Sequence, residues 1–176
     1  MLLKLHMGAK LKAYDGRTAL VIGRFQPFHN GHLEATRGIL GRQAKLLLVI
    51  GSAQEGRTRK NPFSGKERLE MISSCLKAHG LLARTRIILL KDENNHPRWV
   101  KRVLGIAKDA KVAYSGNWLV QSLLSPEFEV HTMKSGIKIS ATEIRGMIRE
   151  GDRRWKKCVP KEISSYIERK GLAKAV

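Results

Sequence analysis

Five short segments of the chain are apolar on both faces or nearly so, and longer polar or amphipathic stretches separate them. Residues 18–23 (TALVIG) and 45–51 (KLLLVIG) show this pattern most clearly, and 86–90, 111–114 and 128–131 repeat it more briefly. A half-exposed strand alternates apolar and polar residues, whereas a continuous apolar run is typical of a strand buried on both sides. The pattern therefore predicts five strands in a parallel sheet.

Helical patterns lie between and after the predicted strands. Ser64 and Glu67 have the spacing of a capping box, as do Ser140 and Glu143, so each pair marks the start of a helix. The pattern predicts helices over 31–41, from Ser64, from about Trp99, from Ser140 and over 160–171. Strands that alternate with helices predict a Rossmann-like, doubly wound α/β fold, in which a parallel five-stranded sheet is followed by C-terminal helices.

The composition is that of an ordinary globular protein of 176 residues, with 42% hydrophobic and 28% charged residues. Cys75 and Cys158 are far apart and in no CxxC spacing, which argues against a disulfide scaffold and a cysteine zinc site and suits a reducing compartment. The longest apolar run, 46–50, is too short to span a membrane, and residues 1–17 lack the features of a signal peptide. We therefore expect a cytoplasmic protein with no membrane partner.

The chain is strongly basic. Lys and Arg number 34 against 15 Asp and Glu, which gives a net charge of +19 at pH 7 and attracts polyanions such as nucleic acid or a phosphate-rich substrate. The basic residues are scattered apart from small clusters at 57–60 and 153–157, and no zinc finger or RNP-like aromatic motif accompanies them. The charge therefore favours a solvated surface or the binding of small anions over the binding of nucleic acid.

The segment after the first predicted strand, GRFQPFHNGH over 23–32, carries the first candidate chemistry. It contains neither GxGxxG nor GxxxxGK[ST], which excludes a dinucleotide fingerprint and a Walker-type phosphate loop. His29 and His32 flank Gly31 at the start of a helix, where both imidazoles share one face and free N–H groups attract anions. We therefore expect a phosphate site here. Structural histidines remain an alternative, as does a metal site, which would need further ligands.

A second element, ISATEIR over 139–145, follows the fifth predicted strand. A helix cap explains Ser140 and Glu143. It does not explain Arg145, because a cation near the positive end of a helix is unfavourable unless an anion compensates for it. A bound phosphate would compensate, with the hydroxyls of Ser140 and Thr142 donating hydrogen bonds to it.

Together, HNGH (29–32) and ISATEIR (139–145) resemble the HxGH and ISxTxxR pair of the nucleotidyltransferase superfamily. Within it, the chain is similar to archaeal nicotinamide-nucleotide adenylyltransferases, because GRFQPFHNGH, IGSAQ, NPFSGKER, KD…WV and YSGN occur in matching order. The similarity runs from about residue 18 to residue 170. We therefore expect one nucleotidyltransferase domain over 18–176, preceded by an N-terminal extension over 1–17.

The resemblance implies that ATP and nicotinamide mononucleotide (NMN) condense to NAD and pyrophosphate, by in-line attack of the NMN phosphate on the α-phosphorus. It implies Mg²⁺ held through phosphate oxygens and water rather than by protein ligands, no tightly bound cofactor, and a homo-oligomer such as a hexamer. His32 would contact the α-phosphate and His29 the polyphosphate. The candidate catalytic residues are His29, His32 and Arg145; the candidate phosphate-binding residues are Gly23, Arg24, Phe25, Gln26, Gly31, Lys60, Ser140 and Thr142; the candidate NMN-binding residues are Asp92, His96, Trp99 and Asn117.

Several alternatives stay open. Trp99 would stack on the nicotinamide ring with Asp92 beside it, or it packs in the core as most tryptophans do. His96 and Lys60 stand where the family usually has Asn and Arg, which bears on amide recognition and on bidentate phosphate contact. The protein could instead be a related adenylyl- or cytidylyltransferase with another phosphorylated acceptor, or a nucleic-acid-binding nucleotide sensor, whose binding to duplexes would depend strongly on salt.

Overall fold

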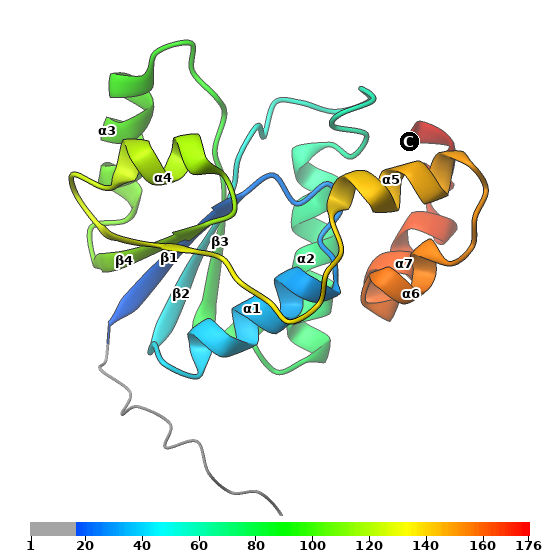
Figure 1. The fold of residues 1–176 in the computed structure, drawn as a ribbon, viewed down its shortest axis with the longest axis horizontal. Coiled ribbons are helices and arrows are strands. Elements are labelled where there is room, and N and C mark those ends of the chain that lie inside the picture. The colour runs from blue at the N-terminus through cyan, green and yellow to red at the C-terminus, as the bar shows by residue number, and fades with distance from the viewer. Residues whose placement is uncertain (1–16) are drawn as a thin grey trace, which may run out of the picture.

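The computed structural model describes residues 17–176, so the predicted extension over 1–17 lies outside the described residues apart from Arg17. One sheet contains five strands: β1 (Thr18–Gly23), β2 (Lys45–Ile50), β3 (Thr85–Leu89), β4 (Ala110–Ser115) and β5 (Glu129–Thr132). All neighbours are parallel, in the order β3-β2-β1-β4-β5 (Figure 1). The predicted five-stranded parallel sheet is confirmed, and no strand end differs by more than one residue from its predicted position.

Helices connect and follow the strands: α1 (Asn30–Leu40), α2 (Gly65–Ala78), α3 (His96–Ile106), α4 (Trp118–Leu124), α5 (Ala141–Arg149), α6 (Trp155–Cys158) and α7 (Lys161–Arg169), with 3₁₀ turns at Leu82–Arg84 and Leu172–Ala175. The sequence pattern does not predict α4 and α6, because helices of 7 and 4 residues are too short to show a helical period. α3 begins three residues before its predicted start, because the side chain of Asn95 caps it by accepting a hydrogen bond from the N–H of Arg98. No helix within residues 17–176 has the length and hydrophobicity needed to cross a membrane.

Alternate residues of the central strand face two separate cores. Ala19 and Val21 of β1 belong to one cluster of buried residues, and Leu20 and Ile22 belong to the other. Helices α1, α2 and α5–α7 cover the first cluster, and α3 and α4 cover the second (Figure 1). Burial on both faces is the reason that the strands are continuous apolar runs.

The C-terminal helices pack onto the body of the domain through α2. Ile163, Tyr166 and Ile167 of α7 are buried, as their spacing predicts. The hydroxyl of Tyr166 also donates a 2.6 Å hydrogen bond to Oε2 of Glu70 on α2. The helix begins at Lys161 with Pro160 as its N-cap, one residue later than expected.

The order of the strands reverses at β1. The chain runs outward through β2 and β3 on one side of β1, and then returns to place β4 and β5 on its other side. Connections that leave two neighbouring strands in opposite directions open a crevice beyond the carboxyl ends of those strands. The loops that begin after Gly23 of β1 and Ser115 of β4 therefore border a crevice.

Candidate active site

A cleft of about 1060 Å³ opens at this edge of the sheet. Ten of the predicted site residues line it, namely Gly23, Arg24, Phe25, His29, Gly31, His32, Asp92, His96, Trp99 and Asn117. The other five, Gln26, Lys60, Ser140, Thr142 and Arg145, do not contribute to its lining. The structure thus brings most phosphate-site candidates and all acceptor-site candidates to one cavity.

His29 and His32 cap the first turn of α1 with their own side chains. The N–H of His29 donates to Nδ1 of His32 (3.2 Å), and the N–H of His32 donates to Nδ1 of His29 (3.4 Å). Each Nδ1 is therefore an acceptor, so each neutral imidazole carries its proton on Nε2. Within residues 17–176 no hydrogen bond uses either Nε2 atom, which leaves two N–H donors for a ligand in the cleft.

Both imidazoles are neutral at pH 7. Burial lowers the pKa of His29 to about 4, although the negative charge of Glu143 opposes this shift. Burial and the neighbouring His29 hold the pKa of His32 well below its usual value. The two rings stack with their centroids 3.6 Å apart, and Phe25 meets His32 edge-on at 5.0 Å. These histidines are therefore placed to act as hydrogen-bond donors rather than as cations.

Close contacts within the protein explain two glycines of the motif. A Cβ at Gly31 would lie 2.9 Å from Oγ of Ser135 and 3.2 Å from the ring of His29, so a larger residue would push aside the hydroxyl of Ser135 or the imidazole of His29. A Cβ at Gly23 would lie 2.9 Å from the ring of Phe25, a residue that has a positive φ of 52°. Both glycines thus make room for neighbouring side chains of the site, in addition to any room that a phosphate requires.

Arg68 of α2 holds the loops around the cleft together. It is fully buried, and its guanidinium donates to the backbone oxygens of Arg24, Gly51 and Ser52 at 2.8 Å each. The sequence contains a signal for this role, since Arg68 lies one turn before Ile72 on the buried face of α2. A charged residue on an apolar face requires partners for its charge.

Gln26 also acts within the protein. Its side chain is buried, donates from Nε2 to the oxygen of Phe63 (2.8 Å) and accepts from the N–H of Phe63 (3.0 Å). Both polar atoms of this amide are therefore occupied by the loop before α2. Gln26 therefore supports the loop after β1 through its two hydrogen bonds to Phe63.

Arg145 is buried behind that same loop. Its Nη1 donates to the backbone oxygen of Gln26 (2.8 Å) and its Nη2 to Oγ1 of Thr142 (3.1 Å), while Nε is buried without a partner among residues 17–176. Ser140 Oγ accepts from the N–H of Glu143 (3.2 Å) and donates to its carboxylate (2.6 Å). The guanidinium that the helix cap leaves unexplained thus donates to a neutral carbonyl and a neutral hydroxyl.

A smaller hollow of about 490 Å³ adjoins the cleft. Lys60 and Arg59 line it together with Asp92, and Arg24 lines both this hollow and the cleft. Lys60 therefore lies beside the predicted phosphate site, in a hollow that shares Arg24 with the cleft. The three cations of this lining outnumber its two carboxylates, Glu55 and Asp92, and the excess of positive charge suits a polyphosphate that extends out of the cleft.

The family model described as cytidylyltransferase-like matches residues 20–147. A nicotinamide-nucleotide adenylyltransferase of Thermococcus onnurineus is 37% identical over 86% of this chain and 82% of its own length. Proteins of the same name from Picrophilus torridus and Pyrobaculum aerophilum are 37% and 34% identical, over 85% and 89% of this chain and 89% and 90% of their own. The chain belongs to the nicotinamide-nucleotide adenylyltransferase family.

Solved structures agree with this family membership. A bifunctional NMN adenylyltransferase/ADP ribose pyrophosphatase from Francisella tularensis superposes with a TM-score of 0.75 at 25% identity, over 90% of this chain and 52% of that one. The same protein complexed with AMP and a Mn ion gives a TM-score of 0.72. The chain thus spans about half the length of this bifunctional protein.

For a nicotinamide-nucleotide adenylyltransferase, the part of the cleft lined by Asp92, His96, Trp99 and Asn117 is the candidate acceptor site. Trp99 is only 8% exposed and belongs to the second core cluster, yet it also lines the cleft. Its side chain therefore packs in the core and borders the cleft at the same time. Oδ1 of Asp92 accepts from the N–H of Ser52 (3.1 Å), which ties the loop after β3 to the loop after β2. His96 is exposed at the start of α3, and Asn117 caps α4 by accepting from Leu119 N–H (2.9 Å).

The cleft also contains residues that our sequence analysis did not select. Trp118 is 75% exposed and Ile137 is 43% exposed, and both line the cleft. Lys134 and Lys138 line it as well and add positive charge. An exposed tryptophan directly after YSGN is a signal in the sequence, but only the fold shows that the segment around Ile137 borders the same cavity.

Proposed function

We propose that this protein transfers the adenylyl group of ATP to the 5′-phosphate of NMN and releases NAD and pyrophosphate. The observation that carries the proposal is the pair of neutral histidines, each with a free Nε2–H, in a cleft that Trp99 and Asp92 also line. The relatives that share most of the chain bear the name of this activity. Positive charge at Arg24 and Lys60 suits two anionic reactants.

The reaction requires positioning and charge stabilisation more than covalent chemistry. An oxygen of the NMN phosphate forms a bond to the α-phosphorus of ATP, while the bond to the bridging oxygen breaks and its electron pair leaves with pyrophosphate. Negative charge develops on the α-phosphate oxygens during this step. Nε2–H of His32 would donate to one of these oxygens, and Nε2–H of His29 would donate to the departing polyphosphate.

Mg²⁺ would enter as part of the MgATP substrate. The carboxylates that line the cleft are Asp92 and Glu93, and Oδ1 of Asp92 already accepts a hydrogen bond from the N–H of Ser52. This lining offers few oxygen ligands for a protein-held Mg²⁺, which suits an ion bound mainly by phosphate oxygens and water. The ion would neutralise charge on the polyphosphate, while the protein supplies hydrogen bonds.

An acceptor panel tests the proposal. The full chain is incubated with ATP and Mg²⁺ and with NMN, nicotinic acid mononucleotide, pantetheine phosphate or FMN in turn, and the dinucleotide product and pyrophosphate are quantified. We expect NAD and pyrophosphate in equal amounts. Efficient adenylylation of another acceptor, with NMN inert, would replace NMN in the proposal.

A matched pair of variants tests the role of the histidines. His32→Asn should lower kcat by roughly 10²–10⁴-fold, because it removes a donor aimed at developing charge. His131→Asn, at an exposed position on β5, is the control and should retain full activity. Equal activity of the two variants would refute the role assigned to His32.

A further inference from the structure

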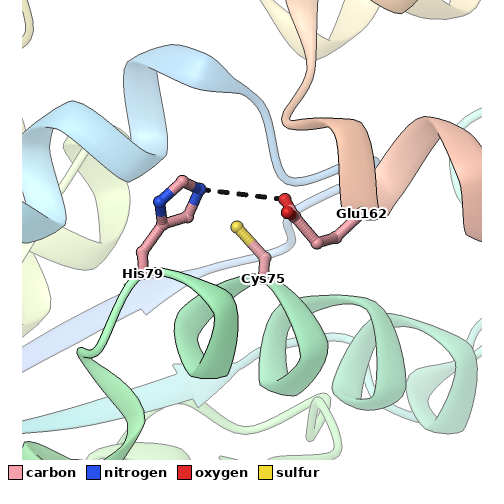
Figure 2. A group of neighbouring side chains, drawn as sticks. All are labelled: Cys75, His79 and Glu162. Atoms are coloured by element: carbon pink, nitrogen blue, oxygen red, sulfur yellow. Dashed lines mark ion pairs between the residues drawn. The ribbon is translucent and has the colours of Figure 1, made fainter.

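A second group of reactive side chains lies where the end of α2 meets the start of α7 (Figure 2). Sγ of Cys75, a ring nitrogen of His79 and a carboxylate oxygen of Glu162 all lie within 4.8 Å of one another. Cys75 and His79 are four residues apart and therefore share one face at the end of α2. None of the three lines the cleft.

The carboxylate of Glu162 lacks hydrogen-bond partners. The side chain is 10% exposed, and both of its oxygens are buried with no hydrogen bond to any of residues 17–176. The dashed line in Figure 2 joins Oε2 to Nε2 of His79 at 3.7 Å, which is longer than a hydrogen bond and is an ion pair only when the imidazole is protonated. The N-terminal end of α7 offers this carboxylate a favourable potential, but its N–H groups make no bond to it. A buried carboxylate without hydrogen bonds is costly, so a bound cation would stabilise this site.

The donors present suit zinc. A sulfur, an imidazole nitrogen and a carboxylate oxygen are ligands that Zn²⁺ accepts together, whereas Mg²⁺ and Ca²⁺ prefer oxygen ligands alone. A thiolate and a carboxylate would neutralise Zn²⁺, which a largely buried site requires. Neighbouring ligand atoms in a tetrahedral zinc site are roughly 3.3–3.6 Å apart, so side-chain movements of about 1 Å would close this group around the ion.

We propose that Cys75, His79 and Glu162 bind a zinc ion that fastens α7 to α2, with water as the fourth ligand. The lack of a CxxC pattern excludes a zinc site of the paired-cysteine type but not this one, because Glu162 is 83 residues beyond His79 in the chain (162 − 79) and only the tertiary fold brings it near. The ion would stabilise the fold, because it would link the end of α2 to the start of α7. The proposal is therefore independent of the adenylyl-transfer activity.

Arg37 of α1 opposes this binding. Its Nη2 lies 2.8 Å from Nδ1 of His79, and because a guanidinium only donates, Nδ1 must accept and the imidazole proton sits on Nε2, facing Glu162. Zinc at Nε2 requires that proton to move to Nδ1, where it would meet the donor of Arg37. Arg37 is exposed and can turn into solvent, so its removal should strengthen zinc binding.

Zinc binding and thermal unfolding of the full chain test the proposal, without nucleotide. After dialysis against Zn²⁺ and removal of excess metal, we expect one zinc per chain by elemental analysis. The Tm should rise by about 5–10 °C at a free Zn²⁺ concentration about a hundred times the Kd. Glu162→Gln and Cys75→Ser should abolish both effects. Cys158→Ser, which removes the other cysteine, is the matched control and should retain them.

Two further measurements keep the test decisive. Cys75 is fully buried, so Cys75→Ser could unfold the protein; Glu162→Gln then serves alone, together with Co²⁺, whose thiolate charge-transfer band reports on the cysteine in the native sequence. Arg37→Ala should lower the Kd for Zn²⁺ by about tenfold, the factor that one lost repulsive contact of 1.4 kcal/mol would give. Zinc binding that survives Glu162→Gln, or that is lost in Cys158→Ser, or no binding at micromolar Zn²⁺, would overturn the proposal.

Discussion

The two neutral histidines of the cleft predict a specific loss of stability at mildly acidic pH. The pKa of His29 is about 4 in the folded protein and about 6.5 when the chain is unfolded. Between these values the unfolded state binds more protons than the folded state, so the free energy of unfolding increases with pH across this window. Lowering the pH through it therefore removes stability. The lowered pKa of His32 acts in the same direction.

The magnitude follows from the two pKa values. Between about pH 7.5 and about pH 5, the difference in proton binding at His29 alone lowers the free energy of unfolding by about 2 kcal/mol. Glu67, whose pKa is lowered to about 2 chiefly by its hydrogen bond with Arg57, contributes mainly below pH 4.5, where its unfolded form takes up a proton. The histidines and this carboxylate thus act in largely separate ranges of pH.

Urea denaturation at the two pH values measures this loss in the wild type and in His29→Asn. Asparagine keeps a side-chain acceptor at the N-cap of α1 and removes the titrating group. We expect the variant to lose about 2 kcal/mol less than the wild type over the interval. His96→Asn, at an exposed position, is the control and should behave as the wild type does. If His29→Asn lost as much stability as the wild type over this interval, the buried imidazole of His29 would not be the cause of the pH dependence.

Three further substitutions test the architecture of the cleft. Arg68→Met should lower the free energy of unfolding by at least about 3 kcal/mol, because three buried carbonyls lose their hydrogen-bond donor. Lys66→Met, on the exposed face of α2, is the control. Equal urea midpoints of the two variants would contradict the role of Arg68. Gly31→Ala should cost about 1–3 kcal/mol by the same assay and also lower kcat, since its Cβ would meet Ser135 and His29. Trp99→Ala should raise the KM for NMN more than the KM for ATP in steady-state kinetics, and equal increases would assign Trp99 to the core alone.

Local patterns in the sequence predicted the elements well because the interactions that define them lie within a few residues. The apolar runs of β1 and β2 are continuous because both faces of the sheet are covered, and burial leaves its mark directly in the residue types. The capping boxes at Ser64 and Ser140 are likewise local hydrogen bonds between residues three apart. His29 and His32 are also three residues apart, and the hydrogen bonds from their backbone N–H groups to each other's Nδ1 fix their tautomers. The spacing alone predicted only that the two rings share a face.

The hydrogen-bond partners of the buried polar side chains were decided by the tertiary structure. Arg145 was predicted to meet a phosphate, but its position beside the carbonyl of Gln26 depends on the packing of α5 against a loop 119 residues away in the chain. Arg68 joins loops that follow different strands, and no local pattern records which carbonyls those loops present.

The same holds for Glu162, which meets Cys75 and His79 only because α7 folds back onto α2. The sequence by itself thus determined the strands, most helices and the histidine motif that lines the cleft, through burial and short-range hydrogen bonds. The order of the strands and the packing of the helices decided which distant groups came together, because a long-range contact depends on the fold of everything between its two partners.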